Sequence, residues 1–271
     1  MAAELPALVS GDWLASHLDD VRVVDVRWYL DGRSGRAEFE AGHIPGAVWL
    51  DIDTDLSAPT STAAGRHPLP SAAAFAAALG RVGIAEGQPV VAYDDAGGSN
   101  AARLWWLLHV LDEPVAVLDG GFAAWPGELS TEVPTLPPVT RPGRPWPAGR
   151  FRDASTVPAA PVVLDARTAE RYAQGDPAID PRPGHIPGAR SAPWADNLDP
   201  ATGRFLDAAT LRERFAALGA ADGGVVAYCG SGVTACHDLL ALALAGYTDT
   251  ALYPGSWSQW GADASRPAET G

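Results

Sequence analysis

The thiol of Cys229 is the side chain of this sequence best suited to act as a nucleophile. It follows the apolar run "VVAY", residues 225–228, and opens the loop "CGSGVTA", residues 229–235. Gly230 and Gly232 allow the loop to curl so that successive N–H groups point inward, which makes an anion-binding concavity before the next helix. A sulfur at its centre is favoured as the thiolate, the nucleophilic form. We therefore predict a reactive Cys229 rather than a small buried apolar residue.

The same loop argues against phosphoryl transfer, a second chemistry of cysteine. That chemistry needs an Arg six residues after the Cys, because a guanidinium holds the phosphoryl group in a bidentate manner. Here that position is Ala235, and no Arg or Lys lies within 229–235. Cys236 should lie in the following helix, where core packing is expected and redox pairing with Cys229 is the alternative. Two cysteines exclude a disulfide framework and leave a four-ligand zinc site incomplete. We predict no metal and no cofactor.

The surroundings of Cys229 have a counterpart earlier in the chain. The matched segments are "VVDVR" (23–27) with "VLDAR" (163–167), "GHIPGA" at both 42–47 and 184–189, "VVAYD" (90–94) with "VVAYC" (225–229), and "LDGGFAAW" (118–125) with "YPGSWSQW" (253–260). A repeat of this length decides the domain organisation. We predict an N-terminal domain over 1–128 and a C-terminal catalytic domain over 153–271. The linker, 129–152, is Pro-rich, with six prolines in residues 129–150.

Each half alternates short apolar strands with helical patterns, which is typical of a parallel sheet covered by helices. One helix is expected to begin at Asp207, to place Leu211, Phe215 and Leu218 on one face, and to end at Gly219. Its counterpart has Ser71, Phe75, Leu79 and Gly80 in the same roles. The predicted fold class is α/β, with two tandem domains that each hold a small parallel sheet flanked by helices. Function in such folds lies at the carboxyl ends of the strands, where Cys229 stands.

Charge and hydropathy limit the partners. The net charge is −14, from 33 acidic and 19 basic residues, which disfavours nucleic acid and anionic membranes. An anionic substrate must therefore meet local Arg side chains or backbone N–H groups. No apolar run approaches the roughly 18 to 20 residues that span a bilayer. The N-terminal residues include Glu4 and Asp12 and lack a basic leader, unlike a secretion signal, so we expect a cytoplasmic protein.

The combination of two "GHIPGA" motifs, "CGSGVTA" and "GSWSQW" resembles the tandem-domain rhodanese superfamily of sulfurtransferases over nearly the whole chain. The loop "CGSGVTAC" is similar to that of 3-mercaptopyruvate sulfurtransferases, whereas thiosulfate-preferring members carry basic residues there. The resemblance implies that Cys229 takes sulfur from a small-molecule donor as a persulfide. The acceptor would be a thiol, such as thioredoxin or a small thiol, or cyanide. The half with Asp94 would be a scaffold that has lost its cysteine. A thiosulfate-preferring enzyme and a non-catalytic sulfur carrier or binding module are the alternatives.

The resemblance also implies roles for further residues. Ser231 would hydrogen-bond the leaving enolate and pair with His67 and Asp53, which are 14 residues apart. Arg171 stands where the family has a carboxylate-binding Arg, and Arg182 is the nearest candidate for a second, with Asp180 competing for that position. The remaining loop residues expected to contact substrate are Gly230, Gly232, Val233 and Thr234.

Residues that occur in both halves are expected to be structural, because one half lacks the nucleophile. Arg27 and Arg167 should therefore form ion pairs, and His43 and His185 should be turn residues. Trp105 and Trp106 follow a helical pattern and are expected to pack in the core or at a domain interface.

Overall fold

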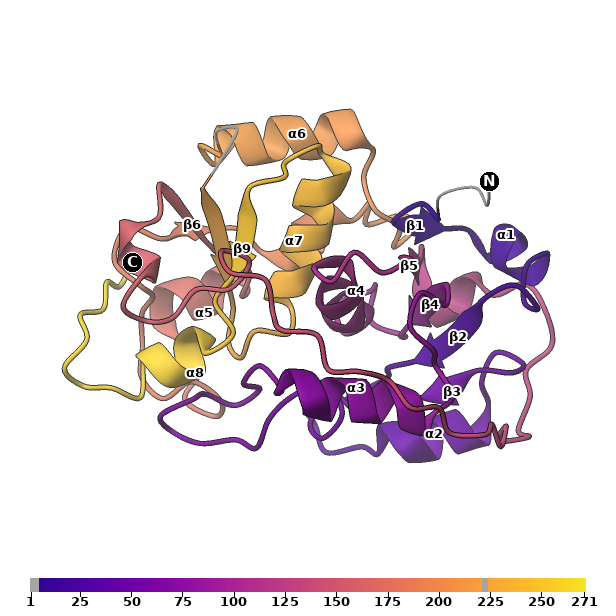
Figure 1. The fold of residues 1–271 in the computed structure, drawn as a ribbon. Coiled ribbons are helices and arrows are strands. Elements are labelled where there is room, and N and C mark those ends of the chain that lie inside the picture. The colour runs from indigo at the N-terminus through magenta and orange to yellow at the C-terminus, as the bar shows by residue number, and fades with distance from the viewer. Residues whose placement is uncertain (1–4, 221–223) are drawn as a thin grey trace. The chain divides into compact units, whose positions relative to one another are not determined.

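The computed structural model describes residues 5–220 and 224–271 and divides into two compact units, each with its own sheet (Figure 1). Unit 1 comprises Met1–Ser57 and Pro70–Trp146, and unit 2 comprises Ala58–Leu69 and Pro147–Gly271. The segment 58–69 lies inside the range 1–128 of the predicted first domain, yet it packs with unit 2. No helix within the described residues is long and apolar enough to cross a membrane.

Unit 1 holds a five-stranded parallel sheet in the order β1-β5-β4-β2-β3. Its strands are β1 (Leu8–Val9), β2 (Arg22–Asp25), β3 (Val48–Trp49), β4 (Val90–Tyr93) and β5 (Val115–Leu118). Its helices are α1 (Gly11–Ala15), α2 (Gly35–Ala41), α3 (Ala72–Arg81), α4 (Ala101–His109) and the 3-10 turn η1 (Gly121–Ala124). Helix α4 packs on β4 and β5, and its Trp105 and Trp106 are buried in the core.

Unit 2 holds a four-stranded parallel sheet in the order β7-β6-β8-β9. Its strands are β6 (Val162–Asp165), β7 (Arg190–Ser191), β8 (Val225–Tyr228) and β9 (Thr250–Leu252). Its helices are η2 (Val157–Ala159), α5 (Ala169–Gln174), η3 (Trp194–Asn197), α6 (Ala208–Ala217), α7 (Ala235–Leu244) and α8 (Ser256–Trp260). Helix α7 packs on β8 and β9, and α6 packs on α7. The α/β fold with two repeated domains is thus confirmed.

The repeat is visible in the register of the sheets. Asp25 of β2 lies opposite Tyr93 of β4, and Asp165 of β6 lies opposite Tyr228 of β8. Arg27 and Arg167 each bind the Asp two residues before them, with a shortest N–O distance of 2.6 Å in both pairs. Both pairs are buried, so the expectation of structural ion pairs is confirmed.

The predicted helix starts are confirmed, and one predicted helix end is wrong. The side chains of Ser71 and Asp207 accept hydrogen bonds from the N–H groups three residues on, which caps α3 and α6. Gly219 follows α6 with a φ of +74°. Gly80, in contrast, lies inside α3, and Gly83 takes the left-handed turn with a φ of +73°. A Cβ on Gly80 would lie 2.3 Å from the carbonyl oxygen of Val139, so this glycine serves the close approach of the Pro-rich segment.

Residues 129–152 are packed against the rest of the structure. Ser130 pairs with His43, and Trp146 packs on Phe75 with ring centroids 5.4 Å apart, both within unit 1. Phe151 pairs with Leu252 of β9 within unit 2. The first part of the Pro-rich segment therefore packs on unit 1, and its last part packs on unit 2.

Candidate active site

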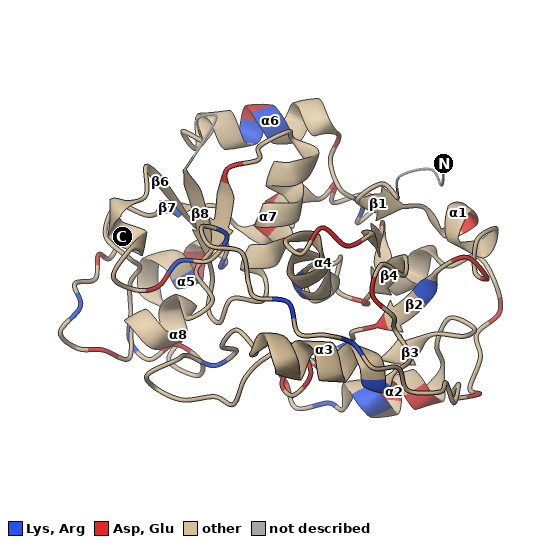
Figure 2. Cartoon of the chain, viewed as in Figure 1, with Lys and Arg blue, Asp and Glu red and all other residues tan. Residues whose placement is uncertain are grey.

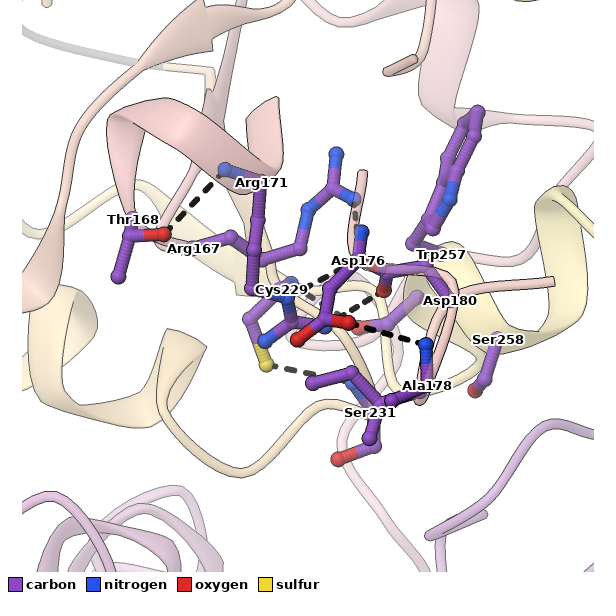
Figure 3. Close-up of polar contacts among 12 residues, drawn as sticks. Arg167, Thr168, Arg171, Asp176, Ala178, Asp180, Cys229, Ser231, Trp257 and Ser258 are labelled. Carbon is purple, nitrogen blue, oxygen red and sulfur yellow. Dashed lines mark hydrogen bonds and ion pairs between the residues drawn. The ribbon is translucent and has the colours of Figure 1, made fainter. Parts of the chain in front are cut away.

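Strand β8 and the loop that follows it hold Cys229 at the carboxyl end of the sheet. The Sγ atom accepts hydrogen bonds from the N–H groups of Ser231, at 3.4 Å, and Gly232, at 3.1 Å (Figure 3). The side chain is 1% exposed. Two backbone N–H groups therefore converge on the sulfur in a buried loop, an arrangement typical of anion-binding loops.

The loop depends on glycine at position 232. Gly232 has a φ of +84°, and a Cβ there would lie 2.6 Å from the carbonyl oxygen of Pro254. Val233 is buried, and Thr234 stands directly before α7. Cys236 lies inside α7, where its Sγ donates to the carbonyl oxygen of Gly232 at 3.4 Å, and it forms no disulfide with Cys229.

The start of α8 forms a second wall of the site. The Oγ atom of Ser256 accepts a hydrogen bond from the N–H group of Cys229 at 3.1 Å. The N–H groups of Trp257 and Ser258 donate to the carbonyl oxygens of Cys229 and Gly230, both at 2.9 Å. Ser256 holds a φ of +51°, so this junction is tightly constrained. These bonds fix the backbone on both sides of the sulfur.

Segment 58–69 brings a histidine to the loop. Nδ1 of His67 lies 2.8 Å from Oγ of Ser231, a hydrogen bond between buried side chains. The segment is tied to α8, because Gln259 donates to the carbonyl oxygen of Ala63 at 2.5 Å. The predicted pairing of Ser231 with His67 is therefore present within unit 2. A hydroxyl bonded to an imidazole, next to a buried sulfur, can supply a proton to a leaving group.

Arg171 of α5 lies beside the loop. A Cβ on Gly230 would be 2.8 Å from its Nη2 atom. Asp180 binds the same guanidinium through Nε at 3.0 Å and Nη2 at 2.5 Å (Figure 3). Asp180 also accepts from the N–H group of Asp176 and lies 3.6 Å from Nη1 of Arg167. Arg171 is thus held in place by a buried carboxylate, with its side chain 21% exposed.

The contacts of two further predicted site residues, Arg182 and Asp53, are described within their own units. Nη2 of Arg182 donates to the carbonyl oxygen of Arg266 at 2.7 Å, and its guanidinium stacks over the ring of Trp257. Asp53 belongs to unit 1, where its carboxylate accepts from Nε1 of Trp28 at 2.9 Å. Its pairing with His67 stays a prediction.

Arg66, which the sequence did not single out, also lies beside the loop. Its Nη2 atom would be 3.2 Å from a Cβ on Gly230, and its N–H group donates to Oγ of Ser258 at 2.9 Å. The only sequence signal was its place next to His67 in "RHPLP".

Unit 1 has the same loop without a nucleophile. The buried carboxylate of Asp94 accepts four backbone hydrogen bonds of 2.7 to 2.8 Å, from the N–H groups of Ala96, Gly98, Asn100 and Ala101. The anion-binding concavity of this copy is therefore filled by the chain's own carboxylate. Across the residues that the structure describes, no group of three or more His, Cys, Asp or Glu side chains could hold a metal ion.

Comparison with known proteins agrees with the fold and the loop. The family model of rhodanese-like domains matches residues 10–128 and 151–263. A Pseudomonas aeruginosa protein that carries the name of a 3-mercaptopyruvate sulfurtransferase is 44% identical over 97% of this chain and 98% of its own. A Mycobacterium tuberculosis protein, SseB, that carries the name of a thiosulfate sulfurtransferase is 38% identical over 100% of this chain and 96% of its own. The crystal structure of the 3-mercaptopyruvate sulfotransferase SseA from Escherichia coli has a TM-score of 0.82 at 32% identity, covering 93% of this chain and 98% of SseA.

Proposed function

The chain belongs to the rhodanese family of sulfurtransferases, and from that premise we propose that it moves sulfur from 3-mercaptopyruvate to an acceptor through a persulfide on Cys229. The observation that carries the proposal is the position of the sulfur, which receives two backbone N–H groups and stands next to the hydrogen-bonded pair of Ser231 and His67. Two relatives, at 44% and 35% identity, carry the name of a 3-mercaptopyruvate sulfurtransferase, which supports the same donor.

The first half-reaction is a nucleophilic displacement at sulfur. The Cys229 thiolate attacks the sulfur of 3-mercaptopyruvate, an S–S bond forms, and the C–S bond breaks. The bonding electrons leave as pyruvate enolate, which gains a proton to become pyruvate. Ser231 and His67 are the groups suited to deliver that proton or to hydrogen-bond the enolate oxygen. Asp53 remains our candidate for orienting His67.

The second half-reaction returns the thiolate. An acceptor thiolate or cyanide attacks the outer sulfur of the persulfide, the S–S bond breaks, and Cys229 leaves as the thiolate. We propose a thiol acceptor, either a small thiol or a protein thiol such as thioredoxin. We also propose a cytoplasmic location, since a reducing compartment keeps such thiols available.

Thiosulfate is the second candidate donor. The SseB relative carries that activity in its name, and the guanidiniums of Arg171 and Arg66 both lie near Gly230. The loop itself has no cation from 229 to 235, which favours a monoanionic carboxylate over a dianion. Steady-state rates with both donors on one preparation test the choice. We expect kcat/KM for 3-mercaptopyruvate to exceed that for thiosulfate at least about tenfold, roughly 1.4 kcal/mol. A preference for thiosulfate would overturn the assignment of the donor, and failure to turn over either donor would favour a sulfur-binding module.

A further inference from the structure

We propose that Arg66 is the second cation that binds the carboxylate of the sulfur donor, so that the donor is held between Arg66 and Arg171. This inference rests on the proposed function and adds the residue that completes its binding site. Arg66 replaces Arg182, the candidate favoured by the sequence, in that role.

The argument starts at Gly230, the residue directly after the nucleophile. The position of a Cβ on this glycine is 2.8 Å from Nη2 of Arg171 and 3.2 Å from Nη2 of Arg66. Two guanidiniums from separate segments therefore meet at one point beside the sulfur. Glycine permits this approach because it has no Cβ, and a planar carboxylate is a group that two guanidinium forks can bind together.

The backbone of Arg66 is fixed to the catalytic loop. Its N–H group donates to Oγ of Ser258 at 2.9 Å, and the N–H group of Ser258 donates to the carbonyl oxygen of Gly230, also at 2.9 Å. Its Nη1 atom donates to the carbonyl oxygen of Ile179 at 3.3 Å. The residue before it, Gly65, has a φ of +95° and packs against Gly255. These contacts aim the Arg66 side chain at the loop rather than at solvent.

Arg171 needs such a partner because Asp180 already occupies one edge of its guanidinium, through Nε and Nη2. A donor carboxylate can therefore reach Arg171 only at its remaining N–H groups. A second guanidinium supplies the additional donors that a carboxylate with two oxygens requires. Arg182 is not among the nearest neighbours of a Cβ on Gly230, and its guanidinium bonds the carbonyl oxygen of Arg266 and lies over Trp257.

The test compares Arg66→Met, which keeps the apolar stem, with Arg66→Lys, which keeps the charge. We expect Arg66→Met to raise KM for 3-mercaptopyruvate about 10- to 100-fold with a smaller change in kcat, as the loss of a charge-assisted hydrogen bond predicts. Arg66→Lys should recover a part of that loss. Arg182→Met is the matched control and should leave KM within about twofold.

A binding measurement separates this inference from the proposed function. Pyruvate carries the carboxylate without the sulfur, and calorimetry with Cys229→Ser should detect its binding, weakened about tenfold or more by adding Arg66→Met. Unchanged KM and unchanged pyruvate affinity in Arg66→Met would overturn the role of Arg66, even if the wild type forms the persulfide. If the wild type forms no persulfide with 3-mercaptopyruvate, the proposed function fails instead, whatever pyruvate does.

Discussion

At the scale of single residues, the hydroxyl of Ser231 is our candidate for the group that handles a proton in the reaction. It is hydrogen-bonded to His67 at 2.8 Å, and its own N–H group donates to Cys229. The side chain can therefore serve the leaving enolate while the backbone serves the thiolate. When thiosulfate is the donor, the leaving group is sulfite, which needs no such proton.

Ser231→Ala should therefore lower kcat with 3-mercaptopyruvate by about 100-fold or more, the usual size of a general acid–base contribution. The rate with thiosulfate should fall much less. His67→Asn should show the same difference between the two donors, because it acts through the same hydroxyl. An equal loss with both donors would mean that Ser231 shapes the loop and does not act on the leaving group.

Arg171 gives a second prediction at this scale. If its guanidinium binds the donor carboxylate in the ground state and the transition state alike, Arg171→Ala should raise KM for 3-mercaptopyruvate far more than it lowers kcat. We expect a rise of about 30-fold or more, from the loss of about 2 kcal/mol of charge-assisted binding. Arg182→Ala is the control. A normal KM in Arg171→Ala would remove this residue from the site.

At the scale of elements, the loop from β8 to α7 uses its two glycines differently. Gly232 needs a positive φ and touches the backbone of Pro254, whereas Gly230 has no positive φ and meets only the ends of Arg side chains. Gly232→Ala should lower the free energy of unfolding by about 2 kcal/mol or more. Gly230→Ala should leave stability nearly unchanged and raise KM for the donor. Thermal denaturation and kinetics on the two variants check this, and similar stability losses in both would contradict it.

The counterpart of this loop in unit 1 explains why a copy without cysteine keeps its shape. Asp94 binds four backbone N–H groups, so its carboxylate takes the place that an anion would have. Asp94→Ala leaves those buried donors unpaired and should destabilise the protein by about 2 kcal/mol or more. Chemical denaturation measures the loss. A stability equal to that of the wild type would show that water replaces the carboxylate at no cost.

The sequence predicts the individual helices and strands better than it predicts the contacts between distant segments. The repeated strands, the Asp–Arg pairs and the helix starts at Ser71 and Asp207 follow local rules of period and capping, and the structure has them. The role of Arg66 could not be predicted, because its approach to Gly230 joins residues 164 positions apart. The predicted helix end at Gly80 is wrong for the same reason, since this glycine serves a contact with Val139 that lies outside its own helix.

At the scale of the whole molecule, a buried carboxyl group makes stability depend on pH. Asp238 is the one charged residue on α7 (Figure 2), where burial raises the pKa of its carboxyl to about 7. Its Oδ1 atom accepts from Asn197 at 2.7 Å. His237 bonds the same Asn197, and Arg214 opposes the pKa shift. The folded protein therefore prefers the neutral acid at this position.

The direction of the change in stability with pH follows from the number of protons that the folded and unfolded states bind. An unfolded Asp titrates near pH 3.9, so between about pH 4 and pH 7 the folded state holds more protons on this group than the unfolded state does. Stability must fall as pH rises through that window and then level off. The full effect is about 4 kcal/mol at 1.36 kcal/mol per pKa unit. Asp238→Asn should remove most of this slope, so that the variant exceeds the wild type in Tm at pH 8 and approaches it near pH 4.

Glu213→Gln is the matched control, because it makes the same charge change at an exposed position of α6. Its Tm should follow the wild type at every pH. If Asp238→Asn also follows the wild type, the carboxyl of Asp238 is ionised in the folded state at neutral pH, contrary to this account.

The most direct test of the central claim is the mass of the intact protein after reaction with 3-mercaptopyruvate in the absence of an acceptor. Wild type and Cys236→Ser should each gain one sulfur atom, about 32 Da, and Cys229→Ser should gain none. Addition of a small thiol or cyanide should remove the added mass as the acceptor takes the sulfur. An adduct that persists in Cys229→Ser, or that disappears only in Cys236→Ser, would contradict the assignment of Cys229 as the nucleophile.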